Sequence, residues 1–126
     1  MATEKFTGAQ TDAALSDADL TGKEFFACKR TTTGVALCGD GDFCDGVISE
    51  GKAQGLHTSF KTGNQLKGIA AEEITVGAKV TPDSDGKFRI ADTAADEVFG
   101  TAISAASEED VLFTIEVDRG HIVPGA

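Results

Sequence analysis

Short runs of alternating apolar and polar residues fill the chain from residue 23 onward, and a period of two is typical of β-strands. In the clearest run, 111–117, the residues of one face are all apolar: Val111, Phe113, Ile115 and Val117. The run 56–62 alternates in the same way. Such strands, separated by Gly- and Asp-rich turns, predict a mainly β fold, a small barrel or sandwich.

Turn residues predict two hairpins. Gly34 ends a turn-like stretch and can adopt a positive φ, so the runs on either side of it are expected to pair. The Pro-Asp-Ser-Asp-Gly sequence at 82–86 is a second turn of this kind. The first hairpin pairs the strands predicted at 24–29 and 35–38, and the second lies within 78–91. Two further strands are predicted at 45–49 and 98–104.

One segment has helical features. Residues 68–77 read GIAAEEITVG, with good helix formers at 70–73 and a glycine, Gly77, at the place where a helix would end. The sequence therefore predicts one short helix over 70–75.

The order of turns and strands repeats within the chain. Gly34 and Gly86 lie 52 residues apart, and Gly46 and Gly100 lie 54 apart. Each pair is embedded in the same succession of strand, turn, strand, acidic loop and short apolar run. This pattern predicts a duplicated β unit, or one barrel closed from two similar halves.

The first 22 residues differ from the rest because they contain few apolar side chains and no sustained period. So little apolar area cannot offset the entropy lost on ordering, so a flexible N-terminal arm is predicted over 1–22. The expected division is this arm, a β-rich domain over 23–118 and a C-terminal tail over 119–126.

The charge balance narrows the list of partners. The chain has 21 acidic against 11 basic residues, a formal net charge of −10, and no basic stripe. Because binding to phosphate backbones depends on Lys and Arg, we expect no nucleic-acid partner. No run approaches the ~18 apolar residues of a membrane span, and no secretory signal is evident, so we expect no membrane partner and synthesis in the cytoplasm.

The three cysteines allow two interpretations. Cys28, Cys38 and Cys44 have the spacing of the first three ligands of a Cys3His zinc site, but Ile48 occupies the position of the fourth. His57 could complete the site only if the strands brought it close. Otherwise the cysteines are reduced thiols that fill small apolar sites, and this second interpretation predicts no metal site.

Catalytic and calcium-binding motifs are not evident. The acidic loops 40–46 and 83–86 lack the later ligands of an EF-hand. No nucleophile, zinc-protease, phosphate-loop or dinucleotide motif is present, and His57 and His121 are interpreted as structural or surface residues. We therefore expect no catalytic residue, no cofactor and no enzyme activity, and instead a binding or structural module.

From Leu20 to Val117 the chain resembles the small capsid decoration (cement) proteins of tailed bacteriophages, the family of the lambda-type head decoration protein. The resemblance departs from the usual family pattern at Phe25-Phe26, where tyrosine is common, and at the three cysteines. The residues that carry it are Gly22-Lys23, Gly46-Val47-Ile48, the run 74–80, Asp85-Gly86-Lys87, Gly100, Ala102, Ala105 and Ala106.

The resemblance implies a compact, β-tulip-like fold and a mechanical role. Proteins of this family form homotrimers at threefold and quasi-threefold positions of the expanded head, where they bind the major capsid protein and stabilise the shell. The expected location is the outer capsid surface of the virion. Within the predicted arm, Phe6, Leu15 and Leu20 are the expected capsid contacts.

Two other classes of function stay open. One is a β-module of a virion or cell surface that binds a host or carbohydrate ligand, although eight Phe with no Trp or Tyr provide a poor stacking surface. The other is a small zinc-binding module or metal-dependent enzyme that uses the Cys and His residues.

Overall fold

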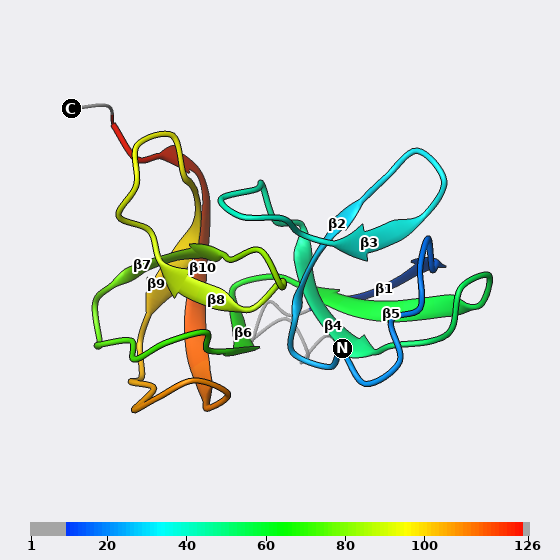
Figure 1. The fold of residues 1–126 in the computed structure, drawn as a ribbon, viewed down its shortest axis with the longest axis horizontal. Helices are drawn as coiled ribbons and strands as arrows, with labels where there is room; N and C mark the ends of the chain where they lie inside the picture. The colour runs from blue at the N-terminus through cyan, green and yellow to red at the C-terminus, as the bar shows by residue number, and fades with distance from the viewer. Residues whose placement is uncertain (1–9, 125–126) are drawn as a thin grey trace, which may run out of the picture.

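The computed structural model describes residues 10–124 and contains two five-stranded antiparallel sheets that lie side by side (Figure 1). The first sheet has the order β1-β5-β4-β2-β3, formed by β1 (Gln10–Leu15), β2 (Ala27–Arg30), β3 (Val35–Leu37), β4 (Gly46–Glu50) and β5 (His57–Thr62). The second has the order β6-β10-β9-β7-β8, formed by β6 (Gln65–Ile69), β7 (Lys79–Pro82), β8 (Phe88–Ile90), β9 (Glu97–Ala102) and β10 (Leu112–Ile122). The mainly β prediction is confirmed. The arrangement is consistent with a sandwich, whereas a closed barrel is not seen, because each sheet keeps two edge strands.

The predicted hairpins and alternating strands are also confirmed. β2 pairs with β3 across the turn at Gly34, and β7 pairs with β8 across the turn at 83–87. In the two alternating runs, one face of each strand is buried, as the period of two predicts: Thr58, Phe60, Phe113 and Ile115.

The two sheets have the same topology. Adding five to each strand number of the first sheet gives the order of the second. The registers agree as well, since Cys28↔Gly46 in one sheet corresponds to Val80↔Gly100 in the other. The duplication predicted from the glycine spacing is therefore confirmed for Gly46 and Gly100.

Three strained backbone positions also follow the repeat. Among the described residues, three that are not glycine have positive φ, and in the other half a glycine with positive φ occupies each equivalent position. The pairs are Phe25 (φ 74°) with Gly77 (92°), Ala95 (73°) with Gly41 (70°), and Asp110 (71°) with Gly55 (87°). Both halves thus have left-handed turns at the same positions. At each position one half has glycine, which adopts this conformation without strain, and the other half has a residue with a side chain.

The predicted helix over 70–75 is wrong, and no helix occurs within residues 10–124. The N–H of Ala70 donates to the carbonyl of Val111 at 3.0 Å, and that of Ile74 donates to Ala106 at 2.9 Å. Because these groups bond to distant segments, they cannot form the i to i−4 bonds of a helix. Accordingly, the described part of the chain has no helix that could cross a membrane.

The predicted boundaries of the arm and the tail differ from the structure. Residues 10–22 belong to the folded body, since β1 pairs with β5 along its whole length and Leu20 is buried. Residues 1–9 of the predicted arm lie outside the described residues. At the other end, residues 119–122 continue β10 instead of starting a tail.

One hydrophobic core joins the two sheets. Residues of the first half, including Ala27 and Val47, pack in the same cluster as the large apolar side chains of the second. At its centre, Phe88 stacks on Phe99 with ring centroids 5.4 Å apart and meets Phe113 edge to face at 6.2 Å. A smaller cluster fills the first half alone: Leu20, Cys28, Val35, Ile48 and Phe60.

Candidate functional site

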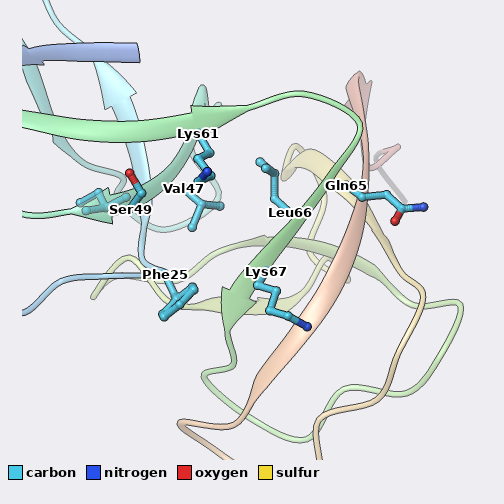
Figure 2. A pocket seen from close by; sticks show the side chains of 8 residues that line it. Phe25, Val47, Ser49, Lys61, Gln65, Leu66 and Lys67 are labelled. Carbon is cyan, nitrogen blue, oxygen red and sulfur yellow. The ribbon is translucent and has the colours of Figure 1, made fainter. Parts of the chain in front are cut away.

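A groove of about 320 Å³ opens where the first sheet meets β6 (Figure 2). Val47 and Leu66, both largely buried, supply apolar surface from β4 and β6, and Phe25 adds an aromatic ring from the segment before β2. Two exposed lysines, Lys61 and Lys67, belong to the same lining. The remaining lining residues are Ile48, Ser49 and Gln65.

Phe25 joins the two sheets through its backbone. Its N–H donates to the carbonyl of Ile48 at 2.8 Å, and its own carbonyl accepts the N–H of Ile69, at the end of β6, at 3.1 Å. Phe25 holds these bonds at a φ of 74°, where an L side chain is disfavoured by about 1–2 kcal/mol. The equivalent residue of the other half is Gly77. At the groove, the first half therefore has a phenylalanine whose backbone conformation is strained.

β6 is an edge strand whose free side faces this region. Within residues 10–124 its only strand partner is β10, and Ile69 directs its N–H away from β10 to Phe25. Because alternate residues of an edge strand direct their backbone groups the same way, Lys67 and Gln65 also point theirs away from β10. Neither residue's backbone has a hydrogen-bond partner among residues 10–124. As far as the described residues go, β6 thus has backbone donors and acceptors without a partner beside an apolar groove.

A charged cluster links the two halves beside the core. Arg89 on β8 donates through Nε to Asp40 of the first half at 2.9 Å, and through its terminal nitrogens to both oxygens of Asp96 at 2.9 and 2.8 Å. The Arg89 hydrogen bonds hold the pKa of Asp96 below its usual value, against the opposing effect of burial. Backbone bonds of Gly41, to Pro82 and from Glu97, join the same loops. This cluster therefore adds ion pairs and hydrogen bonds to the contact between the two sheets.

The residues predicted to touch a capsid do not gather at one site. Leu15 is 43% exposed at the end of β1, close to exposed Leu56. Leu20 is only 1% exposed and packs in the core of the first half, so its side chain is unavailable to a partner. Phe6 lies outside the described residues.

The cysteines and histidines form no metal site in the described part of the chain. Cys28, Cys38 and Cys44 are all buried, and the Cys44 thiol contacts the carbonyl of Gly46 at 3.1 Å. Burial raises the pKa values of Cys28 and Cys44. His57 is exposed on β5, apart from this core. The thiols are therefore packed as small apolar side chains.

We expect the three thiols to resist labelling in the native protein. A disulfide reagent such as DTNB at about pH 8 should label no thiol in the folded chain and all three in guanidinium, because all three side chains are buried away from the reagent. At Cys28 and Cys44 burial also raises the pKa and disfavours the reactive thiolate. Absorbance of the released thiolate measures the count, and zinc analysis of the purified protein is the companion assay. Rapid labelling of a native thiol, or one zinc per chain, would contradict this packing.

The same fold occurs in a phage protein. The structure matches the N base of the head fiber gp8.5 of bacteriophage phi29 with a TM-score of 0.68 and 20% sequence identity, over 87% of this chain and 94% of that chain. No protein family and no curated protein matches the sequence. At this identity the likeness shows a shared fold.

The groove is not predicted by the sequence pattern. The strand β6 was hidden because its last residues, Gly68 and Ile69, begin the segment interpreted as helical. The alternation of Gln65, Leu66 and Lys67 was a weak available signal. The conformation of Phe25 has no signature in composition or spacing, and only its alignment with Gly77 in the repeat could have indicated it.

Proposed function

We propose that this chain is a structural protein of a bacteriophage virion that attaches to the head. The observation that carries the proposal is the fold shared with the N base of a phage head fiber, which extends over nearly the whole of both chains. The sequence resemblance to capsid decoration proteins, which extends from Leu20 to Val117, independently indicates the phage head.

The finer proposal is a decoration protein that binds the major capsid protein as a homotrimer on the outer surface of the expanded head. Contacts available only on the expanded lattice stabilise that state by mass action. The role is one of binding, without catalysis, nucleic acid or membrane. The acidic surface suits it, since a charge of −10 keeps free copies soluble and apart. Of the contacts predicted from sequence, Leu15 and Phe6 are retained, and buried Leu20 is not.

Co-sedimentation with heads tests this function. Purified chain is mixed with expanded and unexpanded heads of the phage that encodes it, each lacking their own copy, and the pellets are compared. We expect the chain to bind expanded heads at a fixed ratio to capsid subunits. Light scattering of protein released from these heads should give a molar mass three times that of the 13.0 kDa monomer. Absence from both pellets would reject the head-binding function, and equal binding to both would reject preference for the expanded lattice.

A matched pair of variants tests the predicted contact. Leu15→Asp is expected to reduce binding to expanded heads at least tenfold, whereas Ile122→Asp, at a similarly exposed apolar residue of the other sheet, should leave it unchanged. Equal binding by the two variants would remove Leu15 from the interface.

A further inference from the structure

The groove beside β6 has the parts of a site for an extended peptide. An added strand needs free backbone groups at a sheet edge, and the side of β6 at Gln65 and Lys67 provides them within the described structure. A bound strand also needs pockets for alternate side chains. Val47, Leu66 and Phe25 surround such an apolar space (Figure 2).

Phe25 is a second, independent indication of a ligand. Its equivalent in the other half is glycine, which adopts the required positive φ without strain. A phenylalanine in this conformation lowers stability, and such strain is concentrated at binding and active sites. Its ring lines the groove, and the strained turn is what places it there.

The charges at the groove indicate the chemistry of the occupant. The side chain of Lys61 has no ion pair and no hydrogen bond to any of residues 10–124, and among these residues the side chain of Lys67 donates only to the hydroxyl of Thr114, at 3.3 Å. Neither lysine therefore has a carboxylate partner within the described structure, although the chain has a net charge of −10. They complement acidic side chains on a ligand.

We propose that this groove binds an extended peptide segment of a partner protein, with acidic and apolar residues in alternation, which pairs with β6 as an added strand. Its apolar side chains contact Phe25, Val47 and Leu66, and its carboxylates meet Lys61 and Lys67. This inference is independent of the phage function, because a synthetic peptide tests it without heads.

The probe is a fluorescein-labelled peptide of about ten residues that alternates Glu and Val, titrated with the full chain and followed by fluorescence anisotropy. We expect saturable binding that weakens at high salt. The same peptide with Pro in place of Val lacks the backbone N–H at every second residue, and its proline φ is fixed near −65°, outside the range of a regular β-strand, so it is expected to bind at least tenfold more weakly. A peptide that alternates Lys and Val is expected to bind at least tenfold more weakly than the acidic one.

Charge variants place the binding at the groove. The double variant K61E/K67E should lose at least tenfold in affinity for the acidic peptide. The control is K79E, because Lys79 is also an exposed strand lysine that donates only to a threonine hydroxyl, at 2.9 Å, and it is expected to bind within twofold of the wild type. Phe25→Gly should weaken binding without changing its salt dependence.

Three results would overturn the proposal. They are no saturable binding by the wild type, equal affinities of K61E/K67E and K79E, and tight binding of the Pro-containing peptide. A variant that lacks residues 1–9 tests whether the protein's own N-terminal segment is the occupant, provided that the variant has the same Tm as the wild type. If this variant binds the peptide and the full chain does not, the groove belongs to the N-terminal segment and not to a partner.

Discussion

Replacing Gly100 by alanine is expected to lower the free energy of unfolding by ~3 kcal/mol or more, a drop on the order of 10 °C in Tm. A Cβ at this position would lie 2.2 Å from the backbone oxygen of Glu116 on the neighbouring strand and 2.8 Å from the Ile115 side chain. A backbone atom in a central pair of strands cannot move aside without breaking the β9–β10 pairing. Thermal unfolding followed by circular dichroism measures the effect.

The duplication makes the same result expected at Gly46. Its Cβ would lie 2.4 Å from the backbone oxygen of Lys61, and the register aligns Lys61 with Glu116 of the other half. Gly77→Ala is the control, since nothing lies within 4 Å of its Cβ and only its positive φ opposes the change, at a cost of about 1 kcal/mol. Similar effects at all three glycines would show that close approach between strands does not explain these two positions.

These glycines show what the sequence reveals about the fold. A glycine that recurs in the same place of a repeated pattern indicated the duplication, and the close backbone approach in both halves explains why it recurs. Alternation likewise identified β5 and β10, because one face of each is buried. Both signals are local, so a single sequence contains them.

Features that depend on contacts between distant segments were not predictable in this way. The residues of β1 read QTDAAL, and none of them is buried, so the strand has no apolar face that would predict it and was assigned to the arm. The helix predicted over 70–75 was overridden by bonds to Val111 and Ala106. The groove forms where the two sheets meet beside β6, and the residue pattern of a single strand does not encode a contact between sheets.

Arg89 links the two sheets through its bonds to Asp40 and Asp96. Arg89→Met is expected to destabilise the protein by about 3–5 kcal/mol at neutral pH. Asp96, only 6% exposed, would lose the two hydrogen bonds from the guanidinium and remain as a buried carboxylate without a cation. Asp40 of the first half would lose the hydrogen bond that Arg89 Nε donates to it. Urea unfolding gives the free energy directly.

Lys29→Met is the matched control for this substitution. Its partner Asp42 occupies the turn equivalent to that of Asp96, and each aspartate accepts the N–H of the residue three positions earlier, Gly39 and Thr93. The side chains of Lys29 and Asp42 are 39% and 37% exposed, so solvent compensates when their ion pair is lost. We expect a cost below about 1 kcal/mol. Equal costs for the two substitutions would show that burial of Asp96 contributes nothing.

The pH dependence separates the ion pair from the packing of the Arg89 side chain. In the native state the pKa of Asp96 lies below the ordinary 3.8 because Arg89 donates to its carboxylate. A lowered native pKa contributes stability at pH above the unfolded value, and the contribution is lost as the pH falls through the native one. Without Arg89 this contribution disappears, since a buried carboxylate without a cation favours protonation. The difference in stability between wild type and Arg89→Met is therefore expected to shrink from pH 7 to about pH 3, and a constant difference would assign the effect to packing alone.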